Sequence, residues 1–158
     1  MQTAQVIELF AGRDPQGKPV VERIPVEINE QNECRLVQSP AFVKGLARGD
    51  LIKVNRENGQ FELRQHSGNL CIRVFSRGDI RILDDAITPE LEKLGGQLDL
   101  ETPRLLVYSI HVSCGFNAIE AVLNAHMTPD SAWFYGNVYD PEDGMTPLNW
   151  WQPILAPE

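Results

Sequence analysis

The sequence is poor in cysteine, has no long apolar run and carries no basic residue near its end. Its 158 residues include only Cys34, Cys71 and Cys114, whose odd number and wide spacing fit neither a disulfide framework nor a C-x-x-C pair. The longest apolar run, Leu105–Tyr108, is far short of the ~20 residues that cross a bilayer. The first residues have neither the basic segment nor the apolar segment of a signal peptide. We therefore expect a cytoplasmic protein that does not bind membranes.

Positive charge is scarce and unevenly placed. The chain has 14 Lys and Arg against 22 Asp and Glu, a net charge of −8. Residues 1–69 hold nine of each sign, so the whole excess of acid belongs to residues 70–158, and no Lys or Arg follows Arg104. An acidic surface repels phosphate backbones, which argues against a nucleic-acid-binding protein.

No catalytic or metal-binding motif is present. The sequence lacks G-x-S-x-G, Walker A and G-x-G-x-x-G. His111 and Cys114, three apart on an expected strand, point to opposite faces and could share a metal only if the chain bends at Ser113. Asp140–Gly144 departs from the calcium-loop pattern and is interpreted as a solvated turn. We assign no catalytic, cofactor-binding or metal-binding residue, which favours a protein that is not an enzyme.

Residues 1–69 are expected to form a small β-rich subdomain. Ile24, Val26 and Ile28 alternate with polar residues, as in a half-buried strand. Asn58-Gly59 lies between two further apolar segments and predicts a hairpin with a type I′ turn. Five short strands in this stretch predict a curled sheet or a barrel.

In residues 70–140, segments with helical spacing of apolar residues alternate with strand-like segments. This order predicts a ferredoxin-like β-α-β-β-α-β unit, so that the whole chain is of the α+β class. A helix is expected from about Asp79 to Leu94, in which Pro89 either makes a kink or restarts the helix with Thr88 as N-cap. Asn117 is expected to cap a second helix. The last strand is placed at residues 133–135 together with residues 138–139, and residues 141–158 form a separate aromatic, acidic tail.

One segment resembles a known family. Residues 39–52 contain Pro40-Ala41-Phe42-Val43-Lys44-Gly45-Leu46-Ala47-Arg48-Gly49-Asp50. This segment is similar to the P-x-F-V-x-G-L-A-x-G-D core of a bacterial family of small cytosolic proteins with a domain of unknown function. The resemblance covers about residues 18 to 125 and implies no activity. The glycines and the aspartate of the core are expected to shape turns.

The aromatic tail suggests a partner surface. All three tryptophans lie within the last 26 residues, in a segment that has acids and no bases. Either Trp150 and Trp151 cover an open sheet face, or they join Asp140, Glu142 and Asp143 in binding a basic protein. We favour a non-enzymatic binding or regulatory protein, of which a toxin-neutralising immunity protein is one form. Replacing the three acids by lysine is expected to weaken partner binding.

Two alternatives remain open. A small-molecule sensor or enzyme would use a cleft between the two halves, in which Arg48, Asp50 and Arg73 would line the site and an arginine would hold an anionic ligand. An oligomerising module would pair the edges of its sheets, and the sequence leaves the oligomeric state open.

Overall fold

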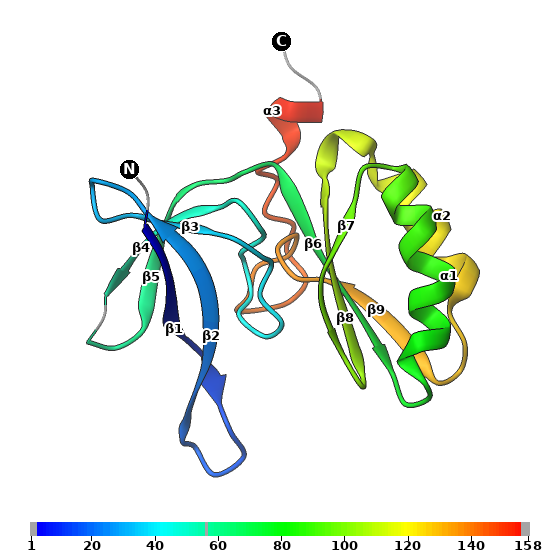
Figure 1. Ribbon diagram of the computed structural model, residues 1–158, viewed down its shortest axis with the longest axis horizontal. Coiled ribbons are helices and arrows are strands. Elements are labelled where there is room, and N and C mark those ends of the chain that lie inside the picture. Colours follow the sequence, from blue (N-terminus) through cyan, green and yellow to red (C-terminus); the bar gives the residue numbers. More distant parts are fainter. Residues whose placement is uncertain (1–2, 56, 156–158) are drawn as a thin grey trace.

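The chain folds into two antiparallel sheets, and an irregular segment of the first part of the chain packs between them (Figure 1). The computed structural model describes residues 3–55 and 57–155. One sheet is formed by the first part of the chain, and the other is covered on one face by two helices. The α+β class expected from the sequence is confirmed. The division at residues 69 and 140 stays a prediction.

The first sheet is a meander whose strands lie in sequence order. Its strands are β1 (Thr3–Arg13), β2 (Pro19–Ile28), β3 (Cys34–Leu36), β4 (Leu51–Asn55) and β5 (Gln60–Gln65). The sheet curls so that its first and last strands approach each other. The Phe10 N–H in β1 donates to the Gly59 carbonyl beside β5 at 3.0 Å. The expected hairpin between β4 and β5 is present. Its turn is not type I′, because Gly59 has a positive φ and Asn58 does not.

The second sheet has the strand order β7-β8-β6-β9. Its elements follow one another as β6 (Asn69–Ser76), α1 (Ile80–Lys93), β7 (Gln97–Thr102), β8 (Leu105–His111), α2 (Phe116–His126) and β9 (Ser131–Tyr135). A 3₁₀ turn, η1 (Val112–Cys114), precedes α2, and the short helix α3 (Gln152–Leu155) follows the sheet. Both α1 and α2 lie on the same face of this sheet (Figure 1).

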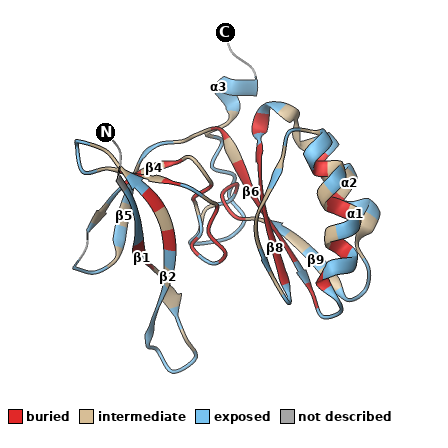
Figure 2. Ribbon diagram, viewed as in Figure 1, coloured by how far each residue is buried: buried red, intermediate tan, exposed pale blue. Residues whose placement is uncertain are grey.

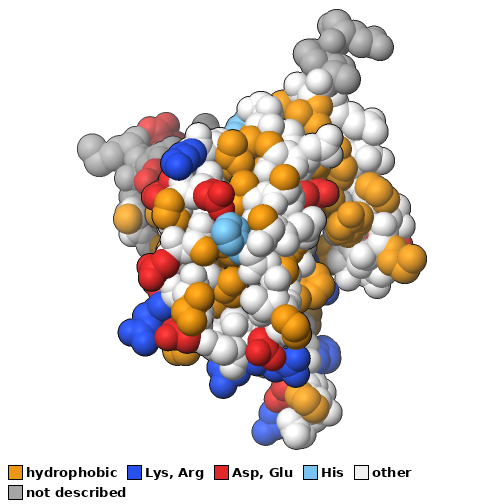
Figure 3. Space-filling view, turned by 90° about the vertical axis from the view of Figure 1, so that its right-hand side faces the viewer, with side chains coloured by type: hydrophobic (Ala, Val, Ile, Leu, Met, Phe, Trp, Pro, Cys, Tyr) orange, Lys and Arg blue, Asp and Glu red, His pale blue; other side chains and the backbone are white. Residues whose placement is uncertain are grey.

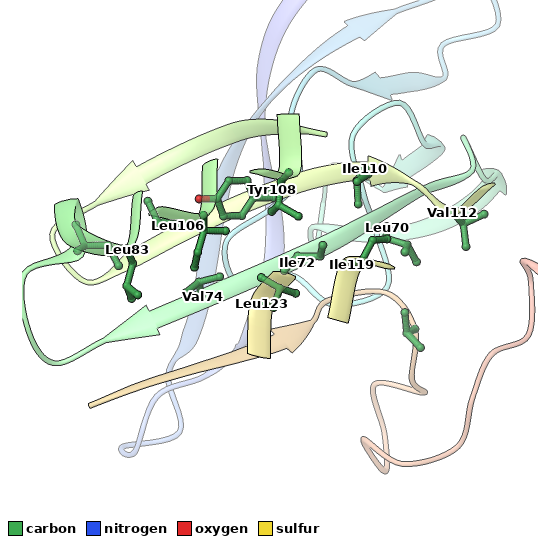
Figure 4. Packing of buried hydrophobic residues seen from close by; sticks show 14 residues of the cluster. Leu70, Ile72, Val74, Leu83, Leu106, Tyr108, Ile110, Val112, Ile119 and Leu123 are labelled. Carbon is green, nitrogen blue, oxygen red and sulfur yellow. The ribbon is translucent and has the colours of Figure 1, made fainter. Parts of the chain in front are cut away.

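The main core lies between this sheet and its helices. Leu70, Ile72 and Val74 of β6 point toward the helices and pack with the apolar faces of β8, α1 and α2 (Figure 4). Each of these three side chains is fully buried, and burial of this kind contributes about 1.5 to 3 kcal/mol per large aliphatic side chain. Because successive strand residues alternate, Cys71 and Arg73 point to the opposite face of the sheet.

That opposite face is covered by the segment from Val37 to Asp50, which runs between the two sheets. Figure 2 shows buried residues in this linking segment as well as in the strands. Val43 and Leu46 pack into the core of the first sheet. Ala41 and Ala47 pack against the second sheet, beside Cys71, Leu105 and Val107. The segment therefore fills the space between the sheets.

Charged side chains of both sheets fasten the linking segment. The Glu22 carboxylate on β2 accepts the N–H groups of Ala41, Phe42 and Val43 at 2.6 to 2.9 Å. The Asp99 carboxylate on β7 accepts the Ser39 N–H at 2.8 Å. Arg73 donates from β6 to backbone carbonyls of the same segment. The buried backbone of this loop thus obtains the hydrogen bonds that a regular element would supply.

Two details of the helices differ from the sequence expectation. The first helix continues through Pro89 without restarting, and the Thr88 hydroxyl bonds to Asp84 and to the Tyr108 hydroxyl instead of capping. The second helix begins at Phe116, with Gly115 and not Asn117 at its N-cap. Phe116 makes edge contacts there with the rings of Tyr135 and Trp151.

Candidate binding site at the edge of the second sheet

A pocket of about 530 Å³ lies along β9, the last strand of the second sheet. This volume is within the range of sites that hold a small ligand or a few residues of a partner. Aromatic side chains form much of the wall, and two basic and two acidic side chains join them. The lining residues that carry the argument are Phe75, Trp133, Phe134, Tyr135, Tyr139, Lys44, Arg73, Glu120 and Asp140.

The pocket extends around the edge of the sheet. Phe134 pairs with Arg73 across the β6–β9 ladder and therefore points away from the helices. Trp133 and Tyr135 pair with Val74 and Ile72 and point toward the helices. A pocket bounded by residues on both faces of β9 must reach across the free side of that strand.

The helical wall is held by two polar contacts. The Tyr135 hydroxyl donates to the Glu120 carboxylate on α2 at 2.9 Å. The Trp133 indole N–H donates to the Asn124 side-chain oxygen on the same helix at 2.8 Å. Burial raises the pKa of Tyr135, and its contact with Glu120 acts in the same direction. Tyr135 thus remains a hydrogen-bond donor, and the Glu120 carboxylate that accepts its hydrogen bond lines the pocket.

Arg73 forms part of the pocket floor. Its side chain is buried, and one terminal nitrogen contacts the carbonyl oxygens of Pro40 and Val43. Among the residues that the structure describes, no carboxylate lies within ion-pair distance of Arg73, and its Nε has no hydrogen-bond partner. Gly136 lies directly over it, because a Cβ at that position would come within 3.2 Å of the guanidinium.

The loop after β9 carries the three acids singled out in the sequence. Asp140 lines the pocket, and its carboxylate accepts the Glu142 N–H at 2.9 Å. Asp143 accepts the N–H groups of Met145 and Thr146, and its bonds with Thr146 lower its pKa to about 2. The three residues form a charged turn at the pocket, and Asp140 and Asp143 also shape that turn.

The two tryptophans are separated from these acids. Trp150 stacks on His66 with ring centroids 4.6 Å apart, and its indole N–H donates to the Asn137 carbonyl at 2.8 Å. Trp151 packs edge-on against Phe116. Both rings are half-buried and packed against the main core. They anchor the tail against His66 and against Phe116 at the start of α2.

His66 lies in the short connection between β5 and β6. Its ring is half-buried under Trp150, its Nδ1 has no hydrogen-bond partner, and burial lowers its pKa. His126 pairs with Glu90 across the two helices. Neither histidine lines the pocket.

Arg48, Asp50 and Arg73, expected to line a cleft between the halves, lie around the linking segment. The Arg48 Nε donates to the Ser109 hydroxyl at 2.8 Å and lies 3.8 Å from Asp99. Asp50 is buried and accepts the N–H groups of Ala47 and Ser67, and its burial raises its pKa to about 6. Of the three, only Arg73 lines the pocket, where the structure places it with Asp140.

Glu120 and Lys44 also line the pocket, and neither was expected from the sequence to be a site residue. Glu120 is an ordinary acid on a helix, and only the fold places it opposite β9. Residues 133–135 carried a usable signal, since three adjacent aromatic residues present large rings to both faces of a strand. No feature of the neighbouring sequence shows that this strand lies at the edge of a sheet.

Residues 3–55 and 57–155 contain no group of three or more side chains placed to hold a metal ion. No helix in the same ranges is long and apolar enough to cross a bilayer.

Comparison with known proteins supports the architecture. The structure resembles the crystal structure of a hypothetical protein from Neisseria gonorrhoeae, with a TM-score of 0.64 and 17% sequence identity over 86% of this chain and 94% of that one. No curated protein matches the sequence. The model of the domain of unknown function DUF4265 matches residues 22–134. This span includes Glu22, which holds the linking segment, and Phe134, which lines the pocket. With well over half of its length matched, the chain belongs to the DUF4265 family.

Proposed function

We propose that this protein is a non-enzymatic binding protein whose C-terminal half engages a basic protein partner. An immunity protein that neutralises a basic toxin is one form of this function. The observation that carries the proposal is the pocket along β9, which combines exposed aromatic rings with Glu120 in its wall and the Asp140 turn beside it.

The aromatic rings provide contact area. Phe134, Tyr139 and Phe75 are 57%, 42% and 37% exposed, and Phe75 and Phe134 meet edge to face. Exposed aromatic rings beside a pocket are typical of interface hot spots. Soluble proteins seldom leave such rings together on the surface unless the patch has a partner.

The negative charge around the pocket favours a positively charged partner. The whole net charge of −8 belongs to residues 70–158, and three of the carboxylates that produce it lie in the turn at residues 140–143 near the pocket. Figure 3, which shows the helix-bearing side, has acidic side chains spread over the face and Lys and Arg mainly along its lower margin. Such a field attracts a positively charged protein and raises its association rate.

The alternative of a small-molecule site between the two halves has less support. Arg48 and Asp50 are engaged in hydrogen bonds within the chain, and the linking segment occupies the space between the sheets. Arg73 is the exception, because it lines the pocket along β9.

We also assign the second sheet and its helices to the ferredoxin-like type. The order β6-α1-β7-β8-α2-β9 and the arrangement β7-β8-β6-β9, antiparallel throughout, support this assignment. In such a unit the last strand lies at an edge, which is where the pocket forms.

Calorimetric titration with two matched peptides tests the proposed function. One capped peptide alternates valine and lysine, and the other has glutamate in place of lysine. We expect the lysine peptide to bind at least about tenfold more tightly and to lose affinity as salt is raised. Equal affinities for the two peptides would contradict a basic partner.

A further inference from the structure

The free side of β9 presents backbone groups with no strand beside them. The Gly136 N–H donates to the Cys71 carbonyl at 2.8 Å, and the Arg77 N–H donates to the Asp130 carbonyl at 2.9 Å. In an antiparallel ladder, alternate residues bond to the same neighbour, so the even-numbered residues of β9 bond to β6. The N–H and C=O groups of Trp133 and Tyr135 therefore point outward, toward the side on which no described strand lies.

The two edges of this sheet are built differently. On β7, the pairing register shifts between Leu98 and Leu100, and the side chain of Asp99 points inward with no exposure. A bulge and an inward charge are two of the devices by which proteins prevent pairing at an edge. On β9, the sequence Ser-Ala-Trp-Phe-Tyr contains no charge and no proline, and its register with β6 is unbroken. Only the β9 edge is left open to another strand.

The pocket supplies walls for the side chains of an added strand. Residues of an extended segment beside β9 would alternate between the face that bears Phe134 and the face that bears Trp133 and Tyr135. On the second face, the carboxylate of Glu120 lies within 2.9 Å of the Tyr135 hydroxyl and lines the same pocket. A lysine or arginine side chain directed to this face meets a negative charge next to aromatic rings, a favourable setting for a cation.

We propose that an extended segment of the basic partner adds to the second sheet as a strand beside β9 and places a lysine or arginine side chain against Glu120. This inference rests on the proposed function and specifies how the partner binds. The mode is strand addition, in which backbone hydrogen bonds give affinity and alternate side chains give specificity. A second copy of the chain is disfavoured as the occupant, because it would bring a second Glu120 and a second acidic turn to the same edge.

The test uses the lysine peptide described above and an analogue with methyl groups on all its backbone amide nitrogens. The analogue keeps the charges and side chains and loses every N–H donor. We expect it to bind about tenfold more weakly, the loss that corresponds to one or two net hydrogen bonds. Amide hydrogen exchange then locates the contact, and the unmodified peptide is expected to slow exchange at Trp133 and Tyr135.

A matched pair of variants places the site independently of the peptide chemistry. Phe134→Lys puts a positive charge on the open strand, and Ile82→Lys puts the same charge on α1, where Ile82 is 69% exposed and lines no described pocket. Because Phe134 is also exposed, both variants are expected to fold. We expect affinity for the lysine peptide to fall about tenfold in the first variant and to stay unchanged in the second.

Each outcome separates the two proposals. If the methylated analogue binds as tightly as the parent, strand addition is wrong, while a preference for lysine over glutamate would still support the basic partner. If lysine and glutamate peptides bind alike, the proposed function itself fails. If the protein alone has twice the mass of one chain and its Trp133 amide is already protected, a second copy occupies the edge and the inference is overturned.

Discussion

The guanidinium of Arg73 reaches from β6 to the carbonyl oxygen of Pro40, 3.2 Å away, and so joins the second sheet to the linking segment. The same nitrogen also contacts the carbonyl of Val43. One side chain thus supplies hydrogen bonds to two buried carbonyls and forms part of the pocket floor. The binding site and the packing of the two sheets therefore depend on a common residue.

Replacing Arg73 by leucine is expected to lower the free energy of unfolding by about 3 kcal/mol. The leucine leaves both carbonyls without a donor, and each buried unsatisfied group costs about 1 to 3 kcal/mol. Urea unfolding followed by circular dichroism measures the change. The control is Arg77→Leu, since the Arg77 side chain is largely exposed and its loss is expected to cost little. Equal stability of the two variants would show that Arg73 does not hold the segment.

A second prediction concerns the glycine that covers this arginine. Gly136→Ala would place a Cβ 2.7 Å from the Cys71 sulfur and 3.2 Å from the guanidinium carbon. Because both neighbours are buried, we expect a loss of about 1 to 3 kcal/mol in unfolding free energy. Gly78→Ala is the matched control, as its nearest contact would be an ordinary 3.6 Å. A thermal melt that fails to separate the two variants would contradict the close packing at Gly136.

The buried carboxyl group of Asp50 is expected to make the stability of the fold depend on pH. Burial raises its pKa from 3.8 to about 6, so the folded protein holds this proton more tightly than the unfolded chain does. Between about pH 4 and pH 6 the unfolded chain releases the proton first, and the contribution of Asp50 to the unfolding free energy falls as pH rises. The fall amounts to roughly 2 to 3 kcal/mol and is complete slightly above pH 6.

The Asp50→Asn variant isolates this contribution. Asparagine cannot titrate, although it also loses one acceptor for the N–H groups of Ala47 and Ser67, which adds a constant offset. We therefore expect the stability of the wild type relative to the variant to decrease from pH 4 to pH 6. A difference that is flat over this range, or that rises, would show that the Asp50 pKa is not raised.

The fourth prediction separates the charge of the acidic turn from its shape. Asp140→Asn, Glu142→Gln and Asp143→Asn together remove three charges and keep side-chain oxygens that can accept the backbone N–H groups of the turn. Lysine at these positions would also remove those acceptors. We expect the triple amide variant to remain folded and to bind the lysine peptide about tenfold more weakly at low salt.

A control with the same change in net charge makes this result specific. Glu57, Asp85 and Glu92 are exposed and do not line the pocket, so their triple amide variant tests the general field alone. Its affinity is expected to change by less than about threefold. Similar losses in both triple variants would assign the attraction to the overall charge and not to the turn beside the pocket.

Local patterns predicted most elements and missed the contacts that decide where some of them end. The strand at residues 133–135 was expected to extend to residues 138–139, but β9 ends at Tyr135. The reason is Asn137, whose side chain accepts the Cys71 N–H and donates to the Asn69 carbonyl, taking the place of a ladder residue. Asn137 and Cys71 are 66 residues apart in sequence, so a hydrogen bond between them that replaces a strand-to-strand bond leaves no local signal.

The candidate site was only partly predictable for a related reason. Asp140, Glu142 and Asp143 stood out as acids in a segment without bases, and the structure places Asp140 in the pocket. Trp150 and Trp151 stood out equally by composition, yet they pack against His66 and Phe116. Composition shows only that aromatic residues and acids occur near each other in the sequence. Which aromatic rings anchor the tail and which line the pocket is decided by the packing of the folded chain.

Mapping the lysine peptide on the protein by amide chemical shifts tests the central claim most directly. The account predicts that the shifts change along β9, at Glu120 on α2 and in residues 139–144, and that the glutamate peptide changes none of them. Shifts concentrated on the first sheet, or around Arg48 and Asp50 between the sheets, would contradict a basic-partner site at the β9 edge.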